Sequence, residues 1–129
     1  MIGYAMFGTN DMPKAHAFYD AVLGAVGIGR LMTFPSGGVA YGPKFGQPML
    51  AIGTPYDGKP ASAGNGTMMS LSMDSRAAVD AIHAAAIAAG GNDEGAPGVR
   101  GEEGPQAFYG AYFRDLDGNK LCAYRMGPA

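Results

Sequence analysis

Few side chains in this sequence have the chemistry of a nucleophile, a general base or a metal ligand. The chain has a single cysteine, Cys122. A reactive thiol needs a nearby base or positive charge, and the adjacent residues Leu121 and Ala123 supply neither. We interpret Cys122 as a packed, inert thiol, since free cysteine is among the most buried residue types. A reactive nucleophile is the alternative.

The two histidines, His16 and His83, both fall in predicted helices. His83 lies beside the apolar stripe of its helix, which is typical of a boundary residue under the helix rather than a ligand. His16 stands one helical turn before Asp20, so we predict a solvated pair that contributes little to stability. Neither histidine has an evident nucleophile or metal partner.

Asp115 and Asp117 resemble a catalytic carboxylate pair, but their setting predicts a structural role. They lie between two runs rich in aromatic and aliphatic residues and precede a glycine, a strong signal for a hairpin. In such a turn, aspartates hold the backbone by side-chain hydrogen bonds. Alternation along the second strand then puts Cys122 and Tyr124 on one face and Arg125 on the other.

Length and composition narrow the class of protein. The chain of 129 residues is the size of one domain, with a net charge of -2 and no cluster of Lys or Arg. We therefore expect no nucleic-acid partner and no anionic membrane. No apolar run is long enough to span a bilayer and the N-terminus lacks the features of a signal peptide, so we expect a cytosolic protein. A single cysteine suits that reducing compartment.

The order of predicted elements repeats. Module 1, about residues 1–54, reads as a strand, a helix and three short strands, and a turn-rich connector covers 55–66. Module 2, about residues 67–126, repeats this order, with Gly90 as the stop of its alanine-rich helix. The two modules form one predicted domain, 1–129. Whether they pair within one chain or by swapping between two chains stays open.

The repeat has an offset of 64 residues, which pairs Tyr4 with Met68. In both first strands the odd positions are apolar enough to pack under the following helix. The even positions share the opposite face, and they mix apolar with polar side chains: Tyr4, Met6, Met68, Ser70 and Ser72. A mixed wall of this kind is typical of a ligand site.

This duplicated unit resembles the vicinal oxygen chelate superfamily, the glyoxalase, bleomycin-resistance and extradiol-dioxygenase group. The likeness rests on Phe18-Tyr19 followed by Val22-Leu23-Gly24, on Gly64-Asn65-Gly66-Thr67, on Ala86–Gly91 and on Asp115–Leu121. The resemblance implies an α+β fold. Two βαβββ modules would form an open, curved mixed sheet around a cleft, often with a homodimer contributing to it.

The resemblance also implies where metal ligands would lie, and the expected His and Glu are missing there. The ligand positions fall on Tyr4, Met68 and Cys122, with a possible fourth near Leu50. Hard divalent ions prefer imidazole nitrogen and carboxylate oxygen, so we expect no metal cofactor and no metal-assisted chemistry. One alternative is a soft site for copper made by the thiolate, the thioether and the phenol; another is a divalent metal bound by displaced ligands.

Our candidate ligand-binding residues lie on or near the face that carries those positions. Tyr4 and Tyr124 offer stacking or a phenol hydroxyl, and Arg100 is either an anion contact or a surface arginine. Either Phe108, Gly110 and Tyr112 or the alternate set with Tyr109 lines the cleft. The full set of candidates is Tyr4, Met68, Ser70, Arg100, Tyr109, Cys122 and Tyr124.

We therefore predict a metal-free protein that binds a small amphipathic or aromatic molecule in the cleft. The first alternative is a metal-dependent glyoxalase-like lyase or dioxygenase, with ligands from displaced positions or from a partner subunit. The second is a non-catalytic dimeric interaction module. A shared fold does not choose among these functions, because function lies in the site.

Overall fold

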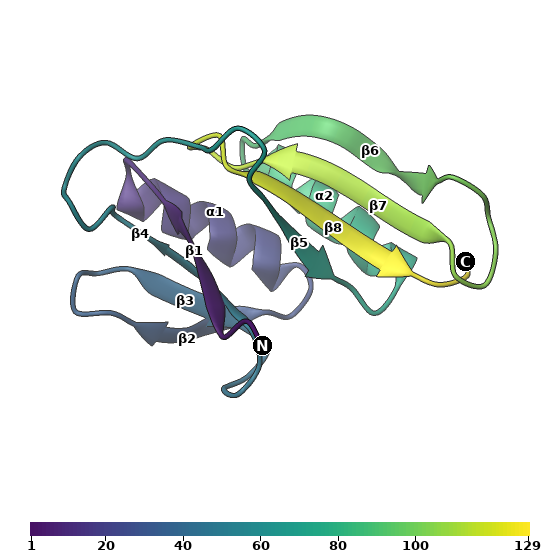
Figure 1. Ribbon diagram of the computed structural model, residues 1–129, viewed down its shortest axis with the longest axis horizontal. Helices are drawn as coiled ribbons and strands as arrows, with labels where there is room; N and C mark the ends of the chain where they lie inside the picture. Colours follow the sequence, from purple (N-terminus) through teal and green to yellow (C-terminus); the bar gives the residue numbers. More distant parts are fainter.

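Each half of the chain folds as a strand, a helix and three further strands in the computed structural model, which describes residues 1–129 (Figure 1). The first half contains β1 (Tyr4–Gly8), α1 (Met12–Gly24), β2 (Gly29–Thr33), β3 (Val39–Gly42) and β4 (Met49–Gly53). The second half contains β5 (Met68–Ser72), α2 (Arg76–Ala88), β6 (Asn92–Arg100), β7 (Phe108–Arg114) and β8 (Lys120–Met126).

The two halves have the same sheet topology. Sheet A has the strand order β1-β4-β3-β2 and sheet B has the order β5-β8-β7-β6. In each sheet the first strand pairs in parallel with the last, and the other neighbours are antiparallel. The predicted α+β class with two βαβββ modules is confirmed. Strands β1 and β5 and helices α1 and α2 are also related by the predicted offset of 64 residues.

Capping residues set the start and end of both helices. The side chain of Asp11 accepts a hydrogen bond from the backbone N–H of Lys14, and Ser75 does the same for Ala78. Gly90, at φ +98°, follows α2 in the left-handed conformation that favours glycine. Helix α1 ends with Gly24 as its last helical residue, and Ala25 is its C-cap.

Both helices lie behind the sheets in Figure 1, and each buries its apolar stripe against one sheet face. Val22 of α1 and Val79 and Ile82 of α2 are fully buried, as are Phe113 and Leu121 on the strands below. A single cluster of 18 buried residues joins the two modules, because α1 also packs against α2. Each such side chain contributes about 1.5–3 kcal/mol of transfer free energy.

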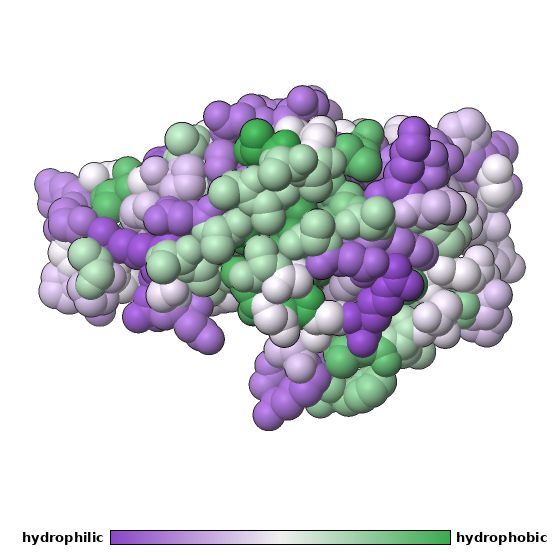
Figure 2. All heavy atoms as spheres, turned by 180° about the vertical axis from the view of Figure 1, so that it is seen from behind, coloured by the Kyte–Doolittle hydropathy of each residue, from purple (hydrophilic) through white to green (hydrophobic).

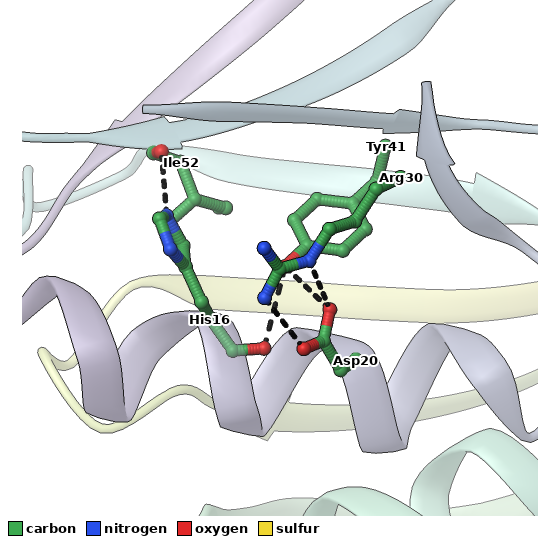
Figure 3. A network of polar contacts seen from close by, with 5 residues as sticks. All are labelled: His16, Asp20, Arg30, Tyr41 and Ile52. Carbon is green, nitrogen blue, oxygen red and sulfur yellow. Dashed lines mark hydrogen bonds and ion pairs between the residues drawn. The ribbon is translucent and has the colours of Figure 1, made fainter. Parts of the chain in front are cut away.

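A polar network fixes α1 to sheet A (Figure 3). Arg30 donates to both carboxylate oxygens of Asp20, at 2.8 and 2.7 Å, and the Tyr41 hydroxyl donates to Asp20 at 3.0 Å. Burial and this hydrogen bond raise the pKa of Tyr41. The predicted solvated pair of His16 with Asp20 is wrong: His16 is buried and its Nε2 lies 3.4 Å from the carbonyl oxygen of Ile52. The carboxylate of Asp20 instead accepts hydrogen bonds from Arg30 of β2 and Tyr41 of β3.

The turn between β7 and β8 connects the two modules through hydrogen bonds that its aspartates accept. Asp115 accepts from the backbone N–H groups of Asp117 and Asn119, which confirms that its carboxylate holds the turn. It also accepts from the Tyr19 hydroxyl of α1 at 2.6 Å. Asp117 accepts from the backbone N–H of Asn10, 2.9 Å away. The hairpin is thus anchored on the start of the first module.

The helix side of the molecule carries a central band of hydrophobic surface, seen from behind in Figure 2. Exposed alanines of α2 belong to this side, among them Ala77, Ala84 and Ala88. Neither helix is long and apolar enough to cross a membrane. The opposite side, where no helix covers the sheets, carries the positions that the sequence singled out.

Candidate functional site

The uncovered face of sheet B, here called the open face, is organised in rows by the strand register. Ser70, Cys122 and Tyr112 form one row across β5, β8 and β7. The next row consists of Met68, Lys120 and Arg114, and the row on the other side consists of Ser72, Tyr124 and Gly110. Directly paired residues share a sheet face. Apolar, hydroxyl, aromatic and basic groups therefore alternate over a small area.

Two aromatic side chains on this face lie with their rings parallel to each other. The rings of Phe108 and Tyr124 are stacked, with centroids 5.4 Å apart and an interplanar angle of 7°. Gly110 makes this possible, because a Cβ at that position would meet the Phe108 ring at 2.5 Å. The glycine lets Phe108 cross β7 and reach Tyr124. The pair offers an apolar platform with a phenol at its edge.

Cys122 lies at the centre of the open face but is only 1% exposed. Burial raises the pKa of its thiol, and polar contacts with Tyr112 and Ser70 offset only part of that effect. A thiol with a raised pKa is protonated at neutral pH and a poor nucleophile. The geometry agrees with our interpretation of Cys122 as a packed residue.

Two cations flank the ring of Tyr112. The guanidinium carbon of Arg100 lies 5.5 Å from the ring centroid, and the ammonium nitrogen of Lys120 lies 5.6 Å from it. Both distances are within reach of a cation–π attraction. Burial, and the neighbouring Cys122, raise the pKa of Tyr112, so its hydroxyl stays protonated at neutral pH.

The open face of sheet A is more apolar. Tyr4 and Met6 of β1 share this face with Ala51 of β4 through the parallel register. A shallow hollow of about 190 Å³ lies here, with Phe34 on its rim and the Tyr4 and Phe34 ring centroids 6.4 Å apart. Tyr4 is 58% exposed. Leu50 points the other way, into the core beneath α1, so the possible fourth ligand position does not fall on that residue.

A larger apolar cavity, about 510 Å³, lies between the modules. Residues of β1 and β5 line it on opposite sides, including Ala5 and Met69, and Leu23 and Ile28 near the end of α1 also contribute. The inner edges of the two sheets are not hydrogen bonded to each other. Met68 and Ser70 lie at the boundary between this cavity and the open face.

The donor groups at the expected metal positions do not fit a hard divalent cation. Met68 and Cys122 lie in neighbouring rows of sheet B, whereas Tyr4 belongs to sheet A. They offer a thioether, a buried thiol and a phenol, and nowhere in the chain do three His, Cys, Asp or Glu side chains form a cluster suited to a metal ion. These groups are poor ligands for such an ion.

The structure brings most of the sequence-predicted residues to the open faces and moves one away. Met68, Ser70, Arg100, Cys122 and Tyr124 all belong to the open face of sheet B, and Tyr4 to that of sheet A.

Tyr109 faces α2 instead. Its hydroxyl donates to Asp80 at 2.6 Å, and the guanidinium of Arg76 lies 5.0 Å from its ring. The set on the open face is thus Phe108, Gly110 and Tyr112.

Phe108, Tyr112 and Lys120 are among the open-face residues that were not in our set of candidates. The length of the turn between β7 and β8 predicts that Tyr112 lies on this face. Because Arg114 pairs with Lys120 across a turn of 115–119, Tyr112 must pair with Cys122 and share its face. The histidines stay outside this face: His83 is buried beneath α2, with its Nε2 3.1 Å from Asp93.

A pair of βαβββ units with helices on one side and open sheet faces on the other defines a class of duplicated α+β proteins. The chain belongs to the Glyoxalase/Bleomycin resistance protein/Dioxygenase superfamily, whose family model matches residues 1–123. The comparison with curated proteins gave no match.

Solved structures agree with this assignment. A glyoxalase/bleomycin resistance protein from Albidiferax ferrireducens is 41% identical, with a TM-score of 0.86, over 97% of this chain and 98% of that chain. A family enzyme from Burkholderia phytofirmans is 20% identical, with a TM-score of 0.69, over 96% and 97% of the two chains, and shows likeness of fold alone.

Proposed function

We propose that the protein binds a small amphipathic or aromatic molecule against the open face of sheet B, without a metal cofactor. The observation that carries this proposal is the stacked pair of Phe108 and Tyr124 beside a row of hydroxyl and thiol groups. Stacked rings favour contact with an aromatic or planar ligand, and a few polar groups fix its orientation.

The titratable groups on the open face of sheet B also favour ligand binding over catalysis. The Cys122 thiol is buried with a raised pKa, the pKa of Tyr112 is also raised, and both histidines lie on the helix side. General acid–base chemistry needs a group whose pKa lies near the working pH. We infer no catalytic residue on the open face.

We further propose that two copies associate through their open faces. Tyr4, Met6 and Met68 are 58%, 49% and 38% exposed, and Ile2 and Phe45 are more exposed still. Contiguous exposed apolar side chains are typical of interfaces or ligand sites. A homodimer would cover them and enclose the bound molecule. The proposal places the protein in the cytosol, where the free thiol stays reduced.

The test of ligand binding is a thermal-shift screen of small aromatic and amphipathic compounds, followed by titration calorimetry. Binding compounds should raise the unfolding temperature, since a ligand that binds the native state stabilises it. Phe108→Ala should weaken them, whereas Tyr56→Ala, which removes a fully exposed ring from the connector between the modules, should not. A screen in which no compound raises the unfolding temperature would leave the interaction module as the better account.

Metal analysis separates the proposal from its enzymatic alternative. Protein purified without chelators should contain well under one equivalent of bound transition metal, and chelation should leave ligand affinity unchanged. One tightly bound ion per chain would overturn the metal-free proposal. Light scattering at micromolar concentrations tests the dimer, and a strictly monomeric protein would contradict it.

A further inference from the structure

On the open face of sheet B, Arg100 and Lys120 have no carboxylate partner; Arg125, on the helix-facing side of β8, also has none. Arg30 pairs with Asp20, Arg76 with Glu103 and Arg114 with Glu94. Neither Arg100 nor Lys120 forms an ion pair. Two positive charges without a direct ion-pair partner thus lie close to the Tyr112 ring, on the face to which we assign ligand binding.

The backbone of β6 holds the Arg100 guanidinium in place. Its Nη1 donates to the carbonyl oxygen of Gly98 at 2.9 Å, and its Nη2 donates to that of Ala96 at 2.7 Å. The side chain lies across two glycines: a Cβ at Gly95 or at Gly98 would come within 3.2 Å of a guanidinium nitrogen. The irregular, glycine-rich course of β6 therefore makes room for a flat arginine.

Donors remain available on this fixed group. A guanidinium has five N–H donors and the two carbonyls take two of them, so three are left for a ligand. Carbonyl dipoles orient the cation without neutralising it. Planar forks of this kind match the two oxygens of a carboxylate or phosphonate.

Lys120 lies at the edge of a second feature that suits an anion. A polar hollow of about 300 Å³ lies between Lys120, Arg114 and the backbone of residues 64–67. The carboxylate of Glu94 lies near these cations and is already paired with Arg114. The local charge is therefore positive although the whole chain carries a formal charge of -2. A cleft with locally positive charge raises the concentration of anions near it.

From these observations we infer that the ligand carries an oxyanion, a carboxylate or phosphonate, which binds Arg100 and Lys120 while its apolar part lies on Phe108 and Tyr124. This inference rests on the proposed function and names the chemical class of its ligand. Both cations lie within cation–π distance of the Tyr112 ring, which belongs to the same open face.

The experiment compares naphthalene-2-carboxylate with its neutral analogue, naphthalene-2-carboxamide, by titration calorimetry. The wild-type chain should bind the carboxylate about tenfold to a hundredfold more tightly, the factor expected for hydrogen bonds to a charged group. Naphthalene-2-phosphonate forms a further arm and shows which oxyanion is preferred. The preference for the charged probes should shrink between 50 and 500 mM NaCl, because the site is only partly buried.

Variants assign the preference to the two cations. Arg100→Gln with Lys120→Met should bring the carboxylate to the affinity of the carboxamide and leave the carboxamide unchanged. Arg125→Gln is the matched control, because Arg125 lies on β8 but pairs with Tyr109 on the helix-facing side. The single variant Lys120→Gln, and the salt dependence of the wild type, serve the same purpose if the double variant does not fold.

The outcomes separate the two proposals. If carboxylate and carboxamide bind equally, or if the preference persists in the double variant, the oxyanion inference is overturned and the aromatic site stands. If neither naphthalene probe nor any screened compound binds, both proposals fall. If only the charged probes bind and the double variant abolishes binding of all of them, the inference is supported in its strongest form.

Discussion

Replacing Tyr19 by Phe tests whether the connection between the modules stabilises the fold. The change removes one hydroxyl, which donates to Asp115 at 2.6 Å between two residues that are 1% and 4% exposed. Hydrogen bonds to charged groups contribute about 1.5–3 kcal/mol. Asp115 keeps its three other donors, two backbone N–H groups and the Asn119 amide, so the loss should stay within that range.

The assay is chemical denaturation at pH 7, supported by thermal unfolding. At this chain length, a loss of about 1.5–3 kcal/mol lowers the unfolding temperature by roughly 5–12 °C. Tyr56→Phe is the control, because Tyr56 is fully exposed and its variant should differ from wild type by less than about 0.5 kcal/mol. A Tyr19→Phe variant as stable as this control would refute the structural role of the bond.

Raising the pH gives the same bond a second test. Burial, and then the charge of Asp115, raise the pKa of Tyr19 well above its ordinary value of 10.0. A raised folded-state pKa contributes stability that is fully present below the unfolded pKa and is lost as the pH rises through the folded value. The stability advantage of the wild type over Tyr19→Phe should therefore narrow above about pH 10.

Two further predictions concern the core and the surface. Ile82→Ala should lower the free energy of unfolding by about 2–5 kcal/mol, because it leaves a cavity in the core. Ile87→Ala, at a position 39% exposed on the same helix, should lower it by less than about 1 kcal/mol. Denaturant midpoints measure both losses, and equal losses would contradict the burial of Ile82. Hydrogen bonds from Arg76, and then from the Gly104 backbone, lower the pKa of Glu103 to about 2 from an ordinary 4.5. The contribution of Glu103 to stability is present above pH 4.5 and lost as the pH falls toward 2, so Glu103→Gln should flatten that part of the curve of stability against pH. An unchanged slope would show that the pair of Glu103 with Arg76 does not form in solution.

Local signals were enough to predict the fold. Helix stops, caps and the alternation of apolar residues each depend on near neighbours in the chain, and the offset from Tyr4 to Met68 then required both modules to have one topology. The direction of the alternation in β1 and β5 followed from the next helix, which needs an apolar surface beneath it. The tertiary structure is consistent with these local preferences, as is typical of natural sequences.

The site was harder to predict because both faces of β7 are aromatic. Composition does not distinguish Tyr109, which packs against Asp80 and Arg76, from Tyr112, which lies on the open face. Only the register across the turn decides, and a one-residue slip exchanges the faces. The predicted pair of His16 with Asp20 was wrong for a related reason: Asp20 binds Arg30, which comes from β2 and not from the same helix.

The duplicated unit has kept one backbone and has given its two open faces different chemistry. Tyr4 and Ala51 make the face of sheet A apolar around a shallow hollow, whereas Arg100 and Lys120 make that of sheet B basic around an aromatic pair. In the binding mode that we propose, a ligand with an apolar body and an acidic group meets the aromatic pair at one end and the two cations at the other. Such an asymmetric site would fix the orientation of the ligand, because each end finds favourable contacts in one direction only.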